Sequence, residues 1–279
     1  MRTDASVHAA KSLVDAAAAP PFKMRPRPFG PGYQTVRRRI IERAIDQGVL
    51  RETGELPQAY GIAMDERVVE YPWAFWRLPK GGKMLDAGST FNHDFLLLRP
   101  PLKDLELTIM TLAPEKRCFW HLGISYVFGD LRKTLFNDRV FDVVASISTI
   151  EHIGLDNAML YSGDARHAEA DENGFEAAVR EFRRILKPGG TCLISVPYGK
   201  RANLGWYQVF DQEKIQSIVA AFAPTSHSID YFGYSRNGWS RGSASDLSDA
   251  TVYDVHSGKG WADDLAASSR AVACLQLNA

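Results

Sequence analysis

Three short apolar segments of this sequence are each followed by residues that could bind or transform a small ligand. These residues are Asp86 with Gly88, Gly129 with Asp130, and Glu151 with His152. Apolar runs of this length are typical of buried parallel strands, and the ligand crevice of an open α/β sheet lies beyond the carboxyl ends of such strands. We therefore expect these residues to meet at one edge of a sheet and to form a binding site there.

Gly88 and Asp86 have separate expected roles in this site. Gly88 has no Cβ and can adopt positive φ, so the backbone could approach a ligand closely at this position. The carboxylate of Asp86 could meet a cationic or hydroxyl-bearing part of the ligand. Residues 83–90 are therefore the stretch around which the rest of the chain is organised.

Alternating strands and helices must position these residues. The strands are expected at residues 83–86, 106–112, 124–128, 141–146, 191–196, 227–234 and 271–277, and the helices at residues 91–98, 175–186 and 212–222. Apolar residues at helical spacing and Asp211 as an N-cap support the last two helices. The predicted fold is α/β, a Rossmann-like doubly wound sheet of seven strands, mostly parallel with an antiparallel C-terminal edge and with helices on both faces.

The N-terminal part is predicted to form an arm and a helical cap over residues 1–78, followed by the binding domain at residues 79–279. The periodicity predicts a helix over residues 33–47, ended by Gly48 as a C-cap. We expect a loop before the aromatic-rich segment at residues 70–78. A second long loop is expected at residues 235–260, where it could close over the site.

The composition favours no nucleic-acid or membrane partner. Lys plus Arg and Asp plus Glu are equal at 33 each among 279 residues, so the chain carries no overall field, although Arg37-Arg38-Arg39 could form a local basic patch. The three scattered cysteines form no metal-binding pattern, so we expect no metal and no disulfide. Neither a signal peptide nor a membrane span is apparent, so we expect a cytoplasmic protein.

The order and spacing of four motifs resemble a class I S-adenosylmethionine-dependent methyltransferase. The motifs are Leu85-Asp-Ala-Gly88, Gly129-Asp130, Phe141-Asp-Val-Val144 with Glu151-His152, and Leu186-Lys-Pro-Gly-Gly190. The resemblance is strongest over residues 80–200. More narrowly, Glu70-Tyr-Pro and residues 148–154 resemble bacterial methyltransferases, some of which are linked to glycan biosynthesis.

The resemblance implies S-adenosylmethionine as the cofactor and assigns residues to each of its parts. The methionine end would be lined by Asp86, Gly88, Ser89 and Thr90. The backbone carbonyl of Ser146 would meet the ammonium group of the cofactor. Asp130 would accept a hydrogen bond from the adenine amino group, and Leu131 would offer its backbone N–H to the ring.

The sequence departs from the family pattern at two places. Thr90 and Asn92 stand where the family usually has glycines, and Thr does not comfortably take left-handed geometry, so the turn must differ. The second strand lacks its usual terminal carboxylate, which leaves Thr111 or Glu115 to hold the ribose. These departures leave open a non-catalytic binding or interaction protein that has kept the fold.

His152 is the first candidate for a general base, because imidazole titrates near neutral pH and the residue follows the fourth strand closely. A scaffold role together with Glu151 is the alternative. The predicted function is methyl transfer to a small-molecule or sugar hydroxyl, with the oligomeric state open and a homodimer as one option. A nicotinamide-dependent oxidoreductase ranks lower, since Gly88-Ser89-Thr90 lacks the required glycine pattern.

Overall fold

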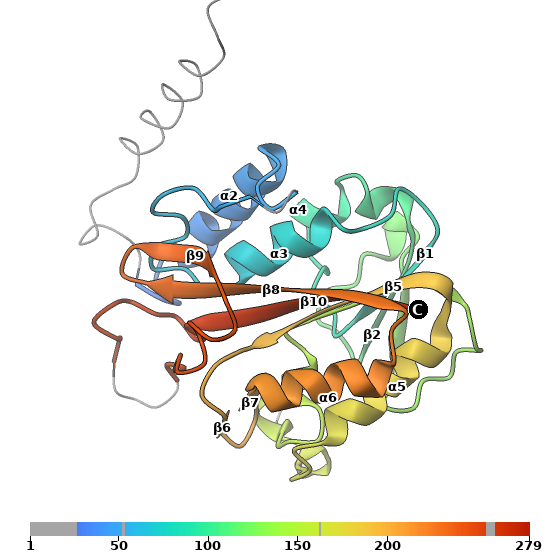
Figure 1. Ribbon diagram of the computed structural model, residues 1–279. Helices are drawn as coiled ribbons and strands as arrows, with labels where there is room; N and C mark the ends of the chain where they lie inside the picture. The colour runs from blue at the N-terminus through green and yellow to red at the C-terminus, as the bar shows by residue number, and fades with distance from the viewer. Residues whose placement is uncertain (1–26, 52–53, 162, 255–259) are drawn as a thin grey trace, which may run out of the picture.

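A computed structural model describes residues 27–51, 54–161, 163–254 and 260–279, and an eight-stranded sheet forms its centre. The strand order is β3-β2-β1-β4-β5-β10-β8-β9 (Figure 1). The strands are β1 (Lys83–Ala87), β2 (Glu106–Thr111), β3 (Ser125–Phe128), β4 (Phe141–Ile147), β5 (Leu186–Pro197), β8 (Ser226–Ser235), β9 (Gly238–Gly242) and β10 (Ala271–Asn278). A separate two-stranded ribbon pairs β6 (Ala202–Asn203) with β7 (Gln208–Val209).

The first five strands are parallel, and the C-terminal strands are antiparallel. β10 lies between β5 and β8 and runs antiparallel to both. The chain leaves β1 toward β2 on one side and returns through β4 on the other, which makes the carboxyl ends of β1 and β4 the switch point. Open α/β sheets bind ligands at such a point. The predicted Rossmann-like fold, with a mostly parallel sheet and an antiparallel C-terminal edge, is confirmed.

The predicted number of seven strands is wrong, because β9 adds an eighth at the edge of the sheet. This strand lies within residues 235–260, which were predicted to be a loop. Contacts with a remote segment hold it: the Trp239 backbone N–H donates to the Tyr60 carbonyl at 2.8 Å, and the Trp239 indole donates to the Met64 carbonyl at 3.0 Å. A short Gly- and Ser-containing segment carries no local signal for such partners.

Helices cover both faces of the sheet (Figure 1). One face carries α2 (Tyr33–Asp46), α3 (Arg67–Phe75) and α4 (Asp94–Leu97). The other carries α5 (Gly174–Ile185) and α6 (Gln212–Phe222), as the periodicity predicts. The carboxylate of Asp211 accepts a hydrogen bond from the Lys214 N–H at 3.0 Å, which confirms the predicted N-cap of α6.

Helix α3 spans the end of the predicted loop and the start of the aromatic-rich segment, for which the sequence predicted no helix. Pro72 lies inside this helix and leaves the Val68 carbonyl without its usual i+4 donor. The Tyr60 hydroxyl donates to this carbonyl instead. Tertiary contacts therefore stabilise a helix that proline and β-branched residues disfavour locally.

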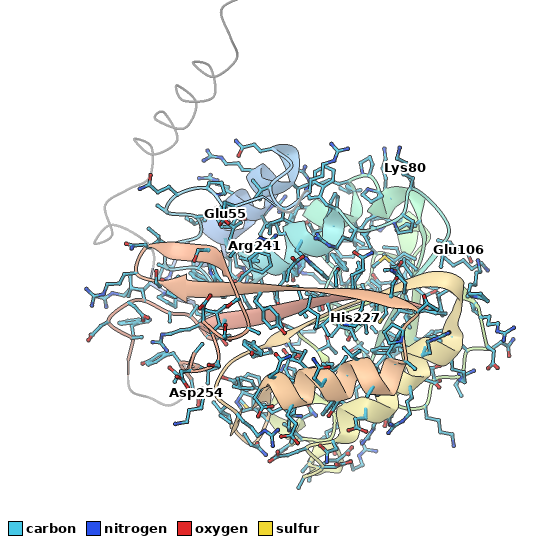
Figure 2. All side chains as sticks on the ribbon, in the orientation of Figure 1. Glu55, Lys80, Glu106, His227, Arg241 and Asp254 are labelled. Carbon is cyan, nitrogen blue, oxygen red and sulfur yellow. The ribbon has the colours of Figure 1, made fainter. Side chains whose placement is uncertain are left out.

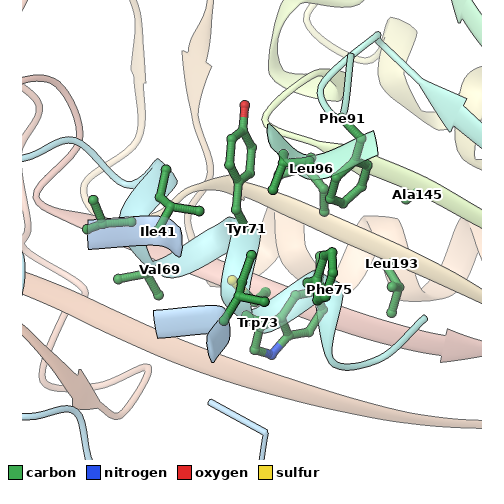
Figure 3. Close-up of a cluster of buried hydrophobic side chains, with 14 of the residues drawn as sticks. Ile41, Val69, Tyr71, Trp73, Phe75, Phe91, Leu96, Ala145 and Leu193 are labelled. Carbon is green, nitrogen blue, oxygen red and sulfur yellow. The ribbon is translucent and has the colours of Figure 1, made fainter. Parts of the chain in front are cut away.

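Residues from the cap region and from the sheet share one hydrophobic core (Figure 3). Trp73 and Phe75 of α3 are buried against Leu96 and against Ala145 and Leu193 of the sheet. The division of the chain after residue 78 stays a prediction, since segments on both sides of it contribute to this core. The first part of the predicted N-terminal arm, residues 1–26, lies outside the described residues.

Both charges occur around the outline of the molecule (Figure 2). Within the basic run, Arg37 pairs with Asp65, and Arg38 with Glu42. Among the described residues, no helix is long and apolar enough to cross a membrane.

Asp230 on β8 links the end of α3 to the antiparallel edge of the sheet. Its carboxylate accepts hydrogen bonds from the Trp73 indole at 2.7 Å and from Arg77 at 3.0 Å. Arg241 of β9 pairs with the same carboxylate. All three ionic side chains are less than a fifth exposed, so these interactions are only weakly screened by solvent.

We expect Asp230→Asn to lower the free energy of unfolding by about 2–3 kcal/mol, because two largely buried arginines lose their charged partner. Urea unfolding followed by circular dichroism measures this change. Asp249→Asn, at an exposed position, is the matched control and should change stability by less than about 0.5 kcal/mol. Equal unfolding midpoints for both variants would contradict the assigned role of Asp230.

Candidate functional site

A cavity of about 230 Å³ lies at the carboxyl ends of the first four strands. Its lining includes Gly88 after β1, Thr111 at the end of β2, Gly129 after β3 and Ser148 after β4. These are the strand ends that flank the switch point. The sequence predicted a binding site at this edge of the sheet.

The Asp86 side chain fixes the loop that follows β1 through hydrogen bonds to its backbone. Its side chain is fully buried, and its two oxygens accept hydrogen bonds from the Thr90 N–H at 3.1 Å and the Phe91 N–H at 2.8 Å. Burial raises the pKa of Asp86 to about 7, although the two N–H donors oppose this rise. The residue is not part of the cavity lining. Asp86 thus positions this loop, and its predicted contact with the ligand stays a prediction.

In the turn after β1, the left-handed positions fall on Gly88 and Ser89 and not on Thr90. Gly88 has φ 120° and Ser89 has φ 64°, whereas Thr90 hydrogen-bonds through its hydroxyl to the Ile147 carbonyl at 2.8 Å. A Cβ at Gly88 would lie 2.1 Å from the Thr149 hydroxyl oxygen, so no larger residue fits. This explains how the loop closes without the family's second glycine. Neither Ser89 nor Thr90 is part of the cavity lining.

Strand β4 extends further than the sequence predicted. Ser146 is fully buried and pairs with Ile194 inside the sheet, so it does not reach the cavity. The strand ends at Ile147, and Ser148 with φ 42° and Thr149 form the wall instead. The predicted contact of the Ser146 carbonyl with the cofactor stays a prediction. The strand ends one residue later than predicted, a difference for which the apolar pattern carries no clear signal.

Thr111 and Glu115 were the two alternatives at the end of β2. Thr111 is part of the lining, and its carbonyl accepts a hydrogen bond from the Gly129 N–H at 2.9 Å, which ties β2 to the loop after β3. Glu115 is not part of the lining, although its charge contributes to the raised pKa of Asp86. The geometry therefore favours Thr111 for contact with a ligand in this cavity.

Asp130 and Leu131 both line the cavity, as the sequence predicted for residues after the third strand. The Asp130 carboxylate accepts hydrogen bonds from the Arg132 guanidinium at 2.7 and 3.0 Å. Burial opposes ionisation of Asp130, but the hydrogen bonds from Arg132 outweigh it and lower the pKa of Asp130. Arg132 also pairs with Glu169, and this ion pair joins the segment after β4 (residues 154–171) to the loop after β3. Neither Arg132 nor Glu169 was predicted from the sequence.

His152 lines the cavity with a defined tautomer. Its Nδ1 lies 2.8 Å from the Trp206 carbonyl oxygen, which can only accept, so Nδ1 carries the proton and Nε2 keeps its lone pair. The ring stacks on Trp206 at 5.2 Å between centroids. Burial lowers the pKa of His152 to about 4, although the bond to the Trp206 carbonyl opposes this. The imidazole is therefore neutral at physiological pH.

The segment after β4, residues 154–171, lines the cavity with Gly154, Asn157, Leu160, Tyr161 and Glu169. Tyr161 lines the cavity and lies 5.2 Å from the His167 ring, measured between centroids. Arg166 is 87% exposed and pairs with Asp164, outside the cavity. Among Tyr161, Asp164, Arg166 and His167, Tyr161 is the residue that lines the cavity.

A sequence-family model supplies the decisive comparison. Residues 104–194 match a family described as a methyltransferase domain. These residues make up about a third of the chain, and the match supports a class I S-adenosylmethionine-dependent methyltransferase. No curated protein matches the chain. The predicted enzyme class and cofactor are confirmed, and the non-catalytic and oxidoreductase alternatives are set aside.

Solved methyltransferase structures are similar to this chain at low sequence identity. A provisionally named methyltransferase of Bacillus halodurans C-125 is 11% identical, with 72% of this chain and 94% of that chain covered and a TM-score of 0.43. Burkholderia thailandensis 1,6-didemethyltoxoflavin-N1-methyltransferase is 11% identical, with 100% and 92% covered and a TM-score of 0.42. Haemonchus contortus phosphoethanolamine N-methyltransferase 2 is 19% identical, with 61% and 41% covered and a TM-score of 0.41.

The lining residues fit the cofactor of this class. Gly88 presents bare backbone to the cavity, because Thr149 occupies the place where a Cβ would stand, and the nearby Ser89 hydroxyl is buried without a hydrogen-bond partner among the described residues. The ionised Asp130 can accept a further hydrogen bond while paired with Arg132. We assign the adenine end to Asp130 and Leu131 and the methionine end to the loop at Gly88, as proposals.

Gly88→Ala should weaken binding of S-adenosylhomocysteine at least about tenfold, or roughly 1.4 kcal/mol, because Cβ would displace Thr149 from the cavity wall. Isothermal titration calorimetry measures this affinity. Gly81→Ala is the matched control, since no atom lies within 4 Å of a Cβ there. Unchanged affinity in Gly88→Ala would show that the ligand does not lie against this loop.

Proposed function

We propose that this methyltransferase transfers a methyl group to a hydroxyl oxygen of a small molecule, with sugars as the first class to test. The observation that carries this proposal is the neutral His152 on the cavity wall. An oxygen acceptor must lose its proton during methyl transfer, whereas the Nε2 lone pair of His152 can accept one. A hydroxyl acceptor therefore suits the chemistry of this residue.

His152 has the hydrogen bond that a general base requires on its far nitrogen. The Trp206 carbonyl holds the Nδ1 proton, fixes the ring orientation and would stabilise the imidazolium once Nε2 is protonated. When bound, S-adenosylmethionine supplies a methyl group that is already activated, so the protein mainly needs to orient the acceptor and take its proton. A base with a low pKa acts here only as the hydroxyl becomes more acidic in the transition state.

Trp206 and Tyr207, after β5, lie beside His152, and the proposal takes this as the side on which the acceptor binds. The two rings are 4.6 Å apart between centroids, and His152 contacts both. This arrangement provides apolar faces beside the candidate base, which suits a small organic acceptor. The expectations of a cytoplasmic location, a homodimer and a link to glycan biosynthesis stay predictions.

His152→Asn should lower kcat by about 100-fold or more while changing the affinity for S-adenosylhomocysteine less than about threefold. The reason is that the variant removes the proton acceptor and leaves the lining near Asp130 intact. Steady-state kinetics with a sugar acceptor and calorimetry measure the two quantities. An equal loss of binding and rate would assign His152 a scaffold role, and normal kinetics would exclude it as the base.

The pH dependence of kcat/KM offers an independent test. The imidazole is already neutral above about pH 5, because its pKa is lowered to about 4, so His152 should produce no inflection near pH 6.5. The rate should fall only as the pH decreases through about 4, where Nε2 becomes protonated. An acid limb near pH 6.5 that disappears in His152→Asn would contradict this assignment.

A further inference from the structure

Glu70 belongs to the Glu70-Tyr-Pro motif in helix α3 and is fully buried behind the cavity wall. Its Oε1 accepts hydrogen bonds from the Ser148 hydroxyl at 2.6 Å and from the Ser195 hydroxyl at 2.7 Å. Its Oε2 accepts one from the Arg67 guanidinium at 2.6 Å. Glu70 itself does not line the cavity, whereas its partner Ser148 does. The carboxylate is therefore bonded directly to a residue of the wall.

The two serines are also bonded to each other. The Ser148 backbone N–H lies 3.1 Å from the Ser195 hydroxyl oxygen and 3.0 Å from the Ser195 carbonyl oxygen, and it donates to both. The Ser195 hydroxyl in turn donates to Glu70, as does the Ser148 hydroxyl. These contacts form a closed ring of hydrogen bonds that fixes both the backbone nitrogen and the side chain of Ser148.

Ser148 has a backbone conformation that serine rarely adopts. Its φ is 42°, in the left-handed region, where the Cβ of any residue other than glycine is crowded by the backbone. Such conformations persist only where the surrounding structure enforces them, and they cluster at functional sites. The ring of hydrogen bonds through Glu70 supplies this restraint.

The conformation of Ser148 sets the direction in which the chain leaves β4. Thr149 follows directly, and the short 3₁₀ helix Ile150–His152 begins after it. Thr149 lies against Gly88, and both Thr149 and His152 line the cavity. A change of φ at Ser148 would therefore move the part of the wall that faces the loop after β1 and carries the candidate base.

We propose that Glu70 is a positioning residue for cofactor binding. It holds Ser148 in the left-handed conformation and thereby keeps Thr149 and His152 in place on the cavity wall. This inference rests on the assignment of the methionine end of the cofactor to the loop at Gly88, and it does not depend on which acceptor is methylated. It also gives a role to the Glu70-Tyr-Pro motif.

Two substitutions at Ser148 separate the restraint from the conformation that it enforces. Ser148→Ala and Ser148→Gly both remove the hydroxyl that donates to Glu70, but only alanine keeps the cost of the left-handed backbone, since glycine has no Cβ. The alanine variant should therefore bind S-adenosylhomocysteine at least about fivefold more weakly than the glycine variant. Isothermal titration calorimetry measures both affinities. Equal affinities, or tighter binding by the alanine variant, would overturn the proposal.

Glu70→Gln tests the other end of the same hydrogen bond. The glutamine amide must point its N–H donors either at Arg67 or at the two serine hydroxyls, so the contacts of the carboxylate cannot all be kept. The affinity for S-adenosylhomocysteine should fall at least about tenfold. Adding Ser148→Gly to Glu70→Gln should recover at least about fivefold of this loss, because glycine needs no restraint. A loss without recovery would assign Glu70 a purely structural role and overturn the proposal.

Asp230→Asn is the matched control. Asp230 is also a largely buried carboxylate bonded to helix α3, through the Trp73 indole, but it does not line the cavity. This variant should lose stability and keep its affinity for S-adenosylhomocysteine within about twofold, because distant sites act independently. All titrations are made at a temperature at which circular dichroism shows each variant folded. A loss of affinity equal to that of Glu70→Gln would contradict a specific role for Glu70.

Two comparisons separate this inference from the assignments on which it rests. If Gly88→Ala binds S-adenosylhomocysteine normally, the ligand lies elsewhere, and the positioning role fails together with that assignment. If Gly88→Ala weakens binding while the two Ser148 variants bind equally, the placement of the cofactor stands and the positioning role is wrong. Should Glu70→Gln fail to fold, the two Ser148 variants still decide.

Discussion

The buried carboxylate of Glu70 joins helix α3 to the carboxyl ends of two central strands. It accepts hydrogen bonds from Ser148 after β4 and from Ser195 on β5, and Arg67 compensates its charge. Because Ser148 is also part of the cavity wall, the position of the cap helix and the shape of the site are set together. Loss of this carboxylate would free the wall and leave Arg67 without its closest acid.

The loops after β1 and β4 depend on each other in the same way. The Ile147 carbonyl accepts the hydroxyls of Thr90 and Thr149, and Thr149 in turn occupies the space that a Cβ at Gly88 would need. The hydrogen bonds of these two threonines thus hold the loops after β1 and β4 together. This arrangement accounts for a cofactor loop with fewer glycines than the family pattern has, and it shows that the departure from that pattern is compensated locally.

The elements that the sequence predicted well are those with local signals. The apolar periodicity of α5, the Asp211 cap of α6 and the apolar runs of the central strands all act within a few residues. Helix α3 and strand β9 were missed for the opposite reason. The first contains Pro72 and relies on the Tyr60 hydroxyl, and the second relies on the backbone around Tyr60 and Met64, far away in the sequence.

The sequence alone determined the order of the central strands and of helices α5 and α6, the glycine requirement at residue 88 and the acidic residue after the third strand, because spacing and backbone geometry are local properties. Only the tertiary structure decided which side chains line the cavity. The Asp86 carboxylate bonds to the backbone of the loop after β1, and Ser148 rather than Ser146 lines the cavity. It also decided that Glu70 bonds to Ser148 and Ser195, since contacts between segments distant in the sequence select the partners of buried polar groups.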